Sequence, residues 1–313
     1  MTSVDSSTTS GILLVDKPAG PTSHDVVART RRAAGTRKVG HAGTLDPMAT
    51  GLLVLGINSS TRLLTFVVGL DKEYFATIRL GQSTSTDDAE GDISQSVDAR
   101  GVSREAIAAG IARLTGEISQ VPSSVSAIKV NGKRAYELAR AGETVELTSR
   151  NVTIAAFDIL DVRDAEAEGI GLIDVDVRVE CSSGTYIRAL ARDLGSDLGV
   201  GGHLTALRRT RVGPFMVSDA ATLENLAPSE QLLAPALVAA QLFAVHNATE
   251  SEVTDLIHGK RVDAGNWRLA ETTGPPSEPI AVVAPGGRLV GLVELTPRGA
   301  KALVNFPTDE VSA

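Results

Sequence analysis

The sequence predicts an α+β protein that ends in a small β-rich domain. Apolar and polar residues alternate with a period of two over 71–80 and 171–181, which is typical of strands. The segment that ends at Leu198 instead carries apolar residues at helical spacing. After residue 246, Gly- and Pro-rich turns separate short apolar runs. With 313 residues, of which 42% are hydrophobic, the chain is long enough for two domains.

The order of the elements follows from the same periodicities and from capping and turn signals. Strands are predicted at 11–16, 52–57, 71–80, 144–149, 152–162, 171–181, 203–215, 280–284, 288–295 and 301–306. Helices are predicted at 24–34, 60–68, 103–114, 134–142, 187–198, 219–226 and 229–241. Thr22 or Ser23 would cap the first helix and Ser103 the third, and Asn131-Gly132 signals a turn. We expect a disordered tail over 1–10, a main domain over 11–243 and the small domain over 244–313.

Composition narrows the classes of protein and partner. A single cysteine, Cys181, excludes an internal disulfide and a multi-cysteine zinc site, which favours a cytoplasmic protein. No apolar run is long enough to span a membrane. The net charge is −8, yet residues 1–70 carry seven basic and four acidic side chains. A locally basic surface on an acidic protein is compatible with a polyanion bound on one face.

A basic run lies on the flank of the first predicted helix. Its five cations have no anion among them: Arg29, Arg31, Arg32, Arg37 and Lys38. A solvated helix face and a phosphate-binding surface both explain such a run.

The stretch 40–51 holds the strongest candidate for chemistry. It combines three glycines, His41 and Asp46-Pro47, and it runs into a buried strand. Pro47 fixes its own φ and biases Asp46 toward extended geometry, so the carboxylate is held on a stiff loop. A turn-forming aspartate is the alternative. An Asp nucleophile needs a fixed cation to keep it ionised, and Arg188, at the start of a helix, is a candidate.

Metal and cofactor chemistry finds little support in the sequence. The five histidines show no pair at ligand spacing, and 40–51 is neither a Walker loop nor a dinucleotide fingerprint. The carboxylates of the loop 81–91, Asp87, Asp88 and Glu90, lack the spacing of a calcium-binding EF-hand. Metal-dependent chemistry is therefore poorly supported, and the Asp46 stretch stays the main candidate.

The motif Gly40-His-Ala-Gly-Thr-Leu-Asp46-Pro-Met-Ala-Thr-Gly51 closely resembles the catalytic motif of the bacterial TruB family of tRNA pseudouridine-55 synthases. Further segments match the family in the right order, over residues 11–215 as a whole. They are Asp16-Lys17-Pro18-Ala-Gly20-Pro-Thr22-Ser23, Lys72-Glu-Tyr74, Leu80-Gly81 through Thr84, Thr86, Asp88 and Gly91, Ser126 to Gly142, Gly184-Thr-Tyr186-Ile-Arg188 and Leu207-Arg208-Arg209.

The resemblance implies a fold and a reaction. The fold would be a pseudouridine-synthase catalytic domain, with a mixed, largely antiparallel sheet flanked by helices and loops, and a PUA-like C-terminal domain. The enzyme would be a cytoplasmic monomer that needs no cofactor and converts one uridine in the T-arm stem-loop of tRNA. The base would be flipped out of its stack before reaction, at a cost of roughly a few kcal/mol.

The resemblance also implies roles for individual residues. Asp46 would be the nucleophile, Tyr74 would stack on the uracil and Arg188 would pair with Asp46. The other implied substrate-binding or supporting residues are Lys17, His41, Tyr186, Leu207, Arg208 and Arg209. The stretch Pro122-Ser123-Ser124-Val125 departs from the family, which has two prolines and an aromatic residue or Met there.

Two alternatives belong to other classes. The same basic surface would serve an RNA-binding protein that acts as a tRNA folding chaperone. A metal-dependent nuclease would use Asp46, Asp87 and Asp88 as ligands.

Overall fold

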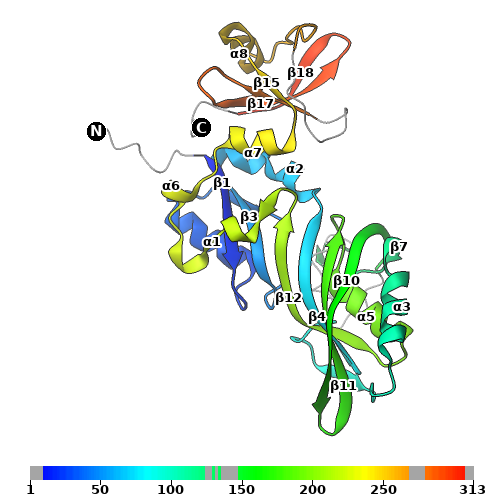
Figure 1. Ribbon diagram of the computed structural model, residues 1–313. Helices are drawn as coiled ribbons and strands as arrows, with labels where there is room; N and C mark the ends of the chain where they lie inside the picture. The colour runs from blue at the N-terminus through cyan, green and yellow to red at the C-terminus, as the bar shows by residue number, and fades with distance from the viewer. Residues whose placement is uncertain (1–9, 124–128, 131–132, 135–146, 268–278, 307–313) are drawn as a thin grey trace. The chain divides into compact units, whose positions relative to one another are not determined.

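The structure is a computed structural model that describes residues 10–123, 129–130, 133–134, 147–267 and 279–306 (Figure 1). The chain forms two compact units. The first unit comprises the described residues of 1–47, 51–68 and 214–313, and the second comprises 48–50 and 69–213.

The first unit holds a small sheet around its N-terminal strand. β1 (Gly11–Lys17) runs antiparallel to β3 (Thr50–Ile57), with Gly11 opposite Ile57 and Lys17 opposite Gly51. β2 (Val39–Ala42) pairs with β3, and the short β14 (Ala221–Thr222) pairs with β1 in parallel. The helix α1 (Ser23–Ala33) begins at a capping box in which Thr22 and Asp25 satisfy each other's backbone N–H groups.

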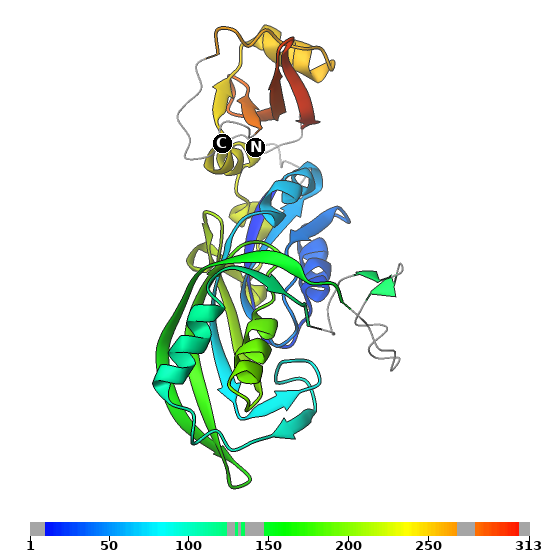
Figure 2. The same ribbon diagram turned by 90° about the vertical axis from the view of Figure 1, so that its right-hand side faces the viewer.

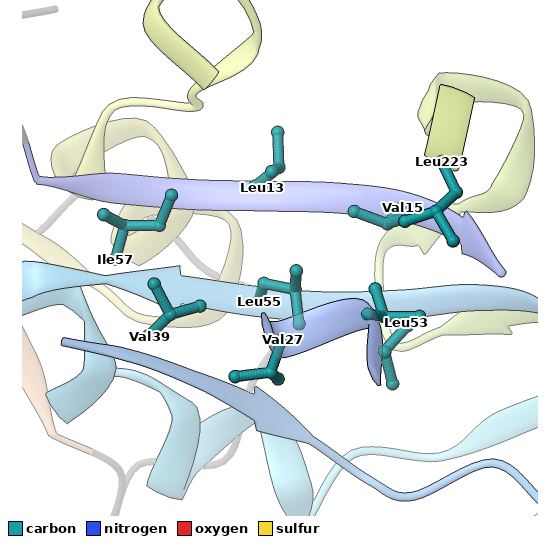
Figure 3. Packing of buried hydrophobic residues seen from close by; sticks show 9 residues of the cluster. Leu13, Val15, Val27, Val39, Leu53, Leu55, Ile57 and Leu223 are labelled. Carbon is teal, nitrogen blue, oxygen red and sulfur yellow. The ribbon is translucent and has the colours of Figure 1, made fainter. Parts of the chain in front are cut away.

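Branched apolar side chains fill the space between α1 and this sheet. Figure 3 shows Leu13 and Val15 of β1 beside Leu53 and Leu55 of β3, with Val27 of α1 against them. Each of the five is at most 5% exposed. Burying a side chain of this size stabilises a fold by about 1.5–3 kcal/mol, so this cluster fixes β1, which ends at Lys17, and β3, which follows the loop of Asp46.

The second unit is built on an antiparallel sheet in the order β12-β4-β11-β10-β7. The strands are β12 (Gly202–Val212), β4 (Lys72–Leu80), β11 (Ile170–Cys181), β10 (Arg150–Ala167) and β7 (Gly116–Gln120). Two helices, α3 (Arg104–Arg113) and α5 (Ile187–Asp197), lie on the same side of it (Figure 2). A Cβ on Gly110 of α3 would lie 2.6 Å from Leu194 of α5, so the glycine permits their close packing.

The C-terminal part of the chain forms a separate four-stranded sheet within the first unit. Its order is β15 (Val245–Asn247), β16 (Ile280–Val283), β17 (Leu289–Thr296) and β18 (Gly299–Asn305). The helix α8 (Glu250–Ile257) packs its buried residues Val253 and Leu256 into the same apolar cluster as Val282 and Val290. The small β-rich domain is thus confirmed.

The remaining elements are short. They are η1 (Asn58–Arg62), α2 (Leu64–Val68), β5 (Gln82–Thr84), β6 (Ile93–Ser96), β8 (Lys129–Val130), β9 (Lys133–Arg134), β13 (Phe215–Met216), η2 (Val217–Asp219), η3 (Leu223–Asn225), α6 (Pro228–Gln231) and α7 (Pro235–Leu242). β8 and β9 pair as the Asn131-Gly132 turn signal predicts, although the turn itself lies outside the described residues. The predicted helix 134–142, most of the predicted strand 144–149 and residues 1–9 of the predicted tail also lie outside them.

Several predicted elements are wrong in detail. The helix predicted at 219–226 is absent, because Ala221 and Thr222 pair with β1 instead. The helix predicted at 229–241 is divided into α6 and α7 around Pro235, which lacks an N–H and stands at the start of the second helix. The segment 60–68 starts as the 3₁₀ helix η1, the loop 81–91 contains β5, and the sequence signals missed α8.

Candidate active site

The loop that carries Asp46 connects β2 and β3, and it is fixed from two sides within the first unit. The buried ammonium of Lys17 donates to the backbone oxygens of Pro18, Pro21 and Pro47, at 2.9, 2.8 and 3.0 Å. Gly20 N also donates to Pro47 O at 2.9 Å. Lys17 is 0% exposed, and its ammonium group orients Pro47, the residue that follows Asp46.

The other side of the loop is held by the first helix. Ser23, which opens α1, accepts a hydrogen bond from Leu45 N at 2.9 Å and donates to Leu45 O at 3.0 Å. Gly43 and Gly51 adopt φ angles of 84° and 101°, which L side chains rarely adopt. The half-buried Asp46 therefore stands between two immobilised neighbours, as the proline and glycines of the stretch predict.

His41 belongs to the same unit but to the strand before the loop. It is half-buried on β2, and its ring meets that of His24 on α1 edge to face, with the centroids 5.7 Å apart. Both histidines thus connect the start of the loop to the helix that carries the basic run.

Tyr74 and two of the predicted substrate-binding residues, Leu207 and Arg209, share one face of the sheet in the second unit. Tyr74 on β4 lies directly opposite Arg209 on β12, and Leu207 lies opposite Ala76. Tyr74, Leu207 and Arg209 are at most 8% exposed. Directly opposite residues of an antiparallel pair project to the same face, so the three side chains line one side of the sheet.

Arg208 lies on the other face of that sheet. It is opposite Phe75, and both positions alternate with the buried ones along their strands. The three consecutive residues Leu207-Arg208-Arg209, which the family motif groups together, are therefore divided between two surfaces.

Arg188 occupies the first turn of α5 and is held by the loop 81–91. Its guanidinium donates to Thr86 O at 2.8 Å and forms an ion pair with Asp88, with Nε 3.5 Å from Oδ2. Both side chains are only 4% exposed. Glu90 N donates to Asp88 at 3.0 Å, which fixes the carboxylate in turn. Removing one partner of such a buried pair typically costs about 3–5 kcal/mol.

Tyr186 precedes α5 and is anchored to the far edge of the sheet. Its N–H donates to Gln120 Oε1 at 2.8 Å, and Gln120 Nε2 donates back to Tyr186 O at 3.1 Å. The buried amide of Gln120 thereby sets the position at which the helix bearing Arg188 begins.

Lys72 is a further polar residue on the face of Tyr74. It lies two residues earlier on β4, is 6% exposed and stands opposite Cys181 on β11. Burial, helped by the charge of Arg209, lowers the pKa of Lys72 to about 8. Burial also raises the pKa of Cys181 to about 11, which keeps the thiol protonated and unreactive.

Three family models together match residues 31–307 of the chain. The family model described as TruB family pseudouridylate synthase (N terminal domain) matches residues 31–187. The models described as tRNA pseudouridylate synthase B C-terminal domain and tRNA pseudouridine synthase II, C terminal, match residues 188–254 and 243–307. A tRNA pseudouridine synthase B from Leifsonia xyli is 58% identical over 97% of this chain and 98% of its own length. The chain belongs to the TruB family of pseudouridylate synthases.

Other TruB relatives and solved structures agree with that assignment. The tRNA pseudouridine synthase B of Thermobifida fusca is 52% identical over 95% of this chain and 98% of its own length. A chain in the structure of an H/ACA RNP bound to a substrate RNA containing 2′-deoxyuridine is 25% identical, with a TM-score of 0.69, covering 96% of this chain and 86% of that one. A Cbf5-Nop10-Gar1 complex gives the same identity and TM-score. The chain is therefore an enzyme with the pseudouridine-synthase fold.

The TruB motifs fall into two groups in the structure. Lys17, His41 and Asp46 come together in the first unit, and Tyr74, Tyr186, Arg188, Leu207 and Arg209 in the second. Each unit is described by itself, so the pairing of Asp46 with Arg188 stays a prediction.

Asp88 is the residue of this site that reasoning from the sequence missed. The sequence marks its carboxylate as a candidate for metal binding only, although the loop that carries it matches the family pattern. The neighbouring Asp87 contacts Arg192 of α5 at 3.4 Å, so the acidic loop faces arginines. Within the described part of the chain, no three His, Cys, Asp or Glu side chains gather as a metal site would require.

The remaining predictions are the location of the protein in the cell and its oligomeric state. No helix among the described residues is long and apolar enough to cross a membrane. The cytoplasmic location and the monomeric state stay predictions.

Proposed function

We propose that the chain converts uridine 55 in the T-arm loop of tRNA to pseudouridine, with Asp46 as the nucleophile. The observation that carries this proposal is the immobilised Asp46 loop, held by Lys17 on one side and Ser23 on the other. The curated relatives named tRNA pseudouridine synthase B, at 52–58% identity, support tRNA as the substrate.

The reaction is an isomerisation that balances without a cofactor. Attack by the Asp46 carboxylate leads to cleavage of the bond between ribose C1′ and uracil N1. The base rotates, a bond forms between C1′ and C5, and the Asp46 carboxylate is regenerated. C5 loses its proton and N1 gains one, so no oxidant, reductant or metal is required by the stoichiometry.

Tyr74 and Arg188 would serve the two requirements of that chemistry. The Tyr74 ring would stack on the extruded uracil, which returns about 1–3 kcal/mol of the cost of flipping. Arg188 would keep Asp46 ionised, and its ion pair with Asp88 supports this role because the guanidinium is already oriented.

The basic run on and after α1 would bind the tRNA backbone. Arg29, Arg31, Arg32, Arg37 and Lys38 are all exposed, so a phosphate can reach each of them. Such contacts give an affinity that falls steeply with salt concentration.

The test is the variant Asp46→Asn, assayed for pseudouridine on a T-arm hairpin. We expect a loss of at least about 1,000-fold in kcat, because the amide cannot act as the nucleophile, while the hairpin is still bound. Asp98→Asn is the matched control, since Asp98 is exposed and contacts only Arg100 among the ion pairs of the described residues. Full activity in Asp46→Asn would contradict the proposal, and loss of hairpin binding together with activity would show that Asp46 serves binding rather than nucleophilic attack.

A further inference from the structure

The sheet face that carries Tyr74 extends to the far edge of the second unit's sheet, where β7 pairs with β10. Arg150 begins β10 and lies directly opposite Gln120, which ends β7. Directly opposite residues of an antiparallel pair project to the same face, and the register from β4 through β11 to β10 places this pair on the face of Tyr74. Arg150 therefore shares a face with the candidate site residues of this unit.

The guanidinium of Arg150 lies against the ring of Tyr186. Its central carbon is 6.0 Å from the ring centroid, and Tyr186 is half-buried. A cation within about 6 Å of an aromatic face is attracted to it. The two hydrogen bonds of the Gln120 amide, at 2.8 and 3.1 Å, hold the backbone of Tyr186, so the ring is presented by a fixed segment. The ring thereby orients a guanidinium at the start of α5.

The charge of Arg150 is not neutralised within the described part of the chain. Arg150 is exposed, and none of the ion pairs among the described residues includes it. On the other face of the same sheet, Arg79 and Arg178 each contact a carboxylate, at 2.8 and 2.7 Å. Glu117, the carboxylate of β7, projects to that other face because three residues separate it from Gln120. Arg150 is therefore an oriented cation that an external anion can reach.

A phosphate is the anion that suits this arrangement. The planar fork of an arginine matches two phosphate oxygens, and an RNA backbone offers such a group at every nucleotide. Tyr186 stands two residues before Arg188, so the guanidinium lies beside the segment that carries a candidate catalytic residue. We propose that Arg150 binds a backbone phosphate of the tRNA T arm, with the Tyr186 ring orienting its guanidinium. This inference rests on the proposed function, because it takes the T arm as the substrate.

A phosphate contact by Arg150 has a signature that support of the fold does not have. The guanidinium would act on the RNA backbone rather than on the reacting base, so affinity changes and the chemical step does not. Each phosphate that a protein cation neutralises also releases counterions, so loss of the contact lowers the salt dependence of binding.

The experiment measures binding and turnover of a T-arm hairpin by the wild type, Arg150→Ala and Arg150→Lys, with KCl from about 50 to 200 mM. Arg150→Ala should raise Kd and KM by about 10-fold at the lowest salt concentration. It should lower the slope of log Kd against log salt by about 1 and leave kcat unchanged. Arg150→Lys should keep the wild-type slope, because the charge remains, with Kd within about 3-fold of the wild type.

A double variant tests the role of the ring. Tyr186→Leu removes the ring but keeps the backbone groups that Gln120 binds. In this background, Arg150→Ala should raise Kd by a smaller factor than in the wild type, because the guanidinium is no longer oriented. Equal factors in the two backgrounds would contradict the orienting role of Tyr186.

The control is Arg104→Ala, which removes another exposed arginine of the same unit. Arg104 donates to Val162 O at 2.8 Å and pairs with Asp161 at 3.9 Å, so its loss should change neither Kd nor the salt slope. An unchanged Kd in Arg150→Ala would overturn the inference. So would a higher Kd with the wild-type salt slope, since Arg150 would then act through packing. Failure of the proposed function looks different, because the wild type would then form no pseudouridine on the hairpin.

Discussion

Lys72 shows how burial sets the behaviour of a single side chain on the face of Tyr74. Its pKa is lowered from 10.5 to about 8, first by burial and then by the charge of Arg209. Between these two values the unfolded chain binds more protons than the folded one, so the free energy of unfolding rises with pH in this window. Below pH 8 both states are protonated and the folded protein bears the cost of a buried charge.

The variant Lys72→Met tests this because its side chain is neutral at every pH. From pH 7.5 to 10, the wild type should gain about 1–3 kcal/mol of stability relative to the variant. Denaturant unfolding of both proteins at each pH measures the difference. The buried Cys181, whose pKa is raised to about 11, has the opposite effect above pH 9. Because the charges of Lys72 and Cys181 influence each other, the difference between the two proteins below pH 9 is the cleaner measure. Parallel pH curves would contradict the assignment.

At the scale of residues, charged side chains can be identified from the sequence, but the residues that they contact cannot. Asp46 could be singled out because Pro47 and the glycines constrain their own backbone, which is a local property. Asp88 could not, because its ion pair with Arg188 joins residues 100 positions apart and depends on the folded loop. For the same reason, the division of Leu207, Arg208 and Arg209 between two faces requires the register of β12 on β4.

At the scale of elements, α8 is fixed at its start by a capping box that also organises the only tryptophan. Thr249 accepts a hydrogen bond from Glu252 N at 3.3 Å, and Glu252 accepts one from Trp267 Nε1 at 2.9 Å. His246 stacks on the Trp267 ring at 3.8 Å and contacts the same carboxylate. The cap therefore supports an aromatic pair as well as the helix.

Thr249→Ala should destabilise this part of the chain by about 1 kcal/mol, because the first turn loses its side-chain acceptor. Trp267 fluorescence during thermal unfolding reports it directly, since no other tryptophan contributes. Thr254→Ala, in the middle of the same helix, is the control and should shift the midpoint little. Equal shifts in both variants would show that the cap contributes nothing specific.

Secondary-structure elements could be predicted where the periodic pattern was long. The predictions failed where pairing with a distant strand determined the structure. The alternation over 71–80 and 171–181 gave β4 and β11 almost to the residue. The sequence around 219–226 favours a helix, yet two of its residues, Ala221 and Thr222, pair with β1. A helix propensity of a few tenths of a kcal/mol per residue does not withstand such pairing.

At the scale of the whole molecule, the site residues are distributed over both units. Asp46 belongs to the first unit, and Tyr74 and Arg188 belong to the second, with about 140 residues of chain between the first and the last of them. Their order along the chain was sufficient to recognise the family. The structure of each unit then shows the hydrogen bonds that hold the Asp46 loop and the ion pair between Arg188 and Asp88.

The most direct test of the account is chemical mapping of pseudouridine in tRNA from cells that lack this chain and are complemented with the wild type or with Asp46→Asn. We expect pseudouridine at position 55 with the wild type, and unmodified uridine there in the deletion and in Asp46→Asn. Modification of position 55 in cells that contain only Asp46→Asn would contradict it.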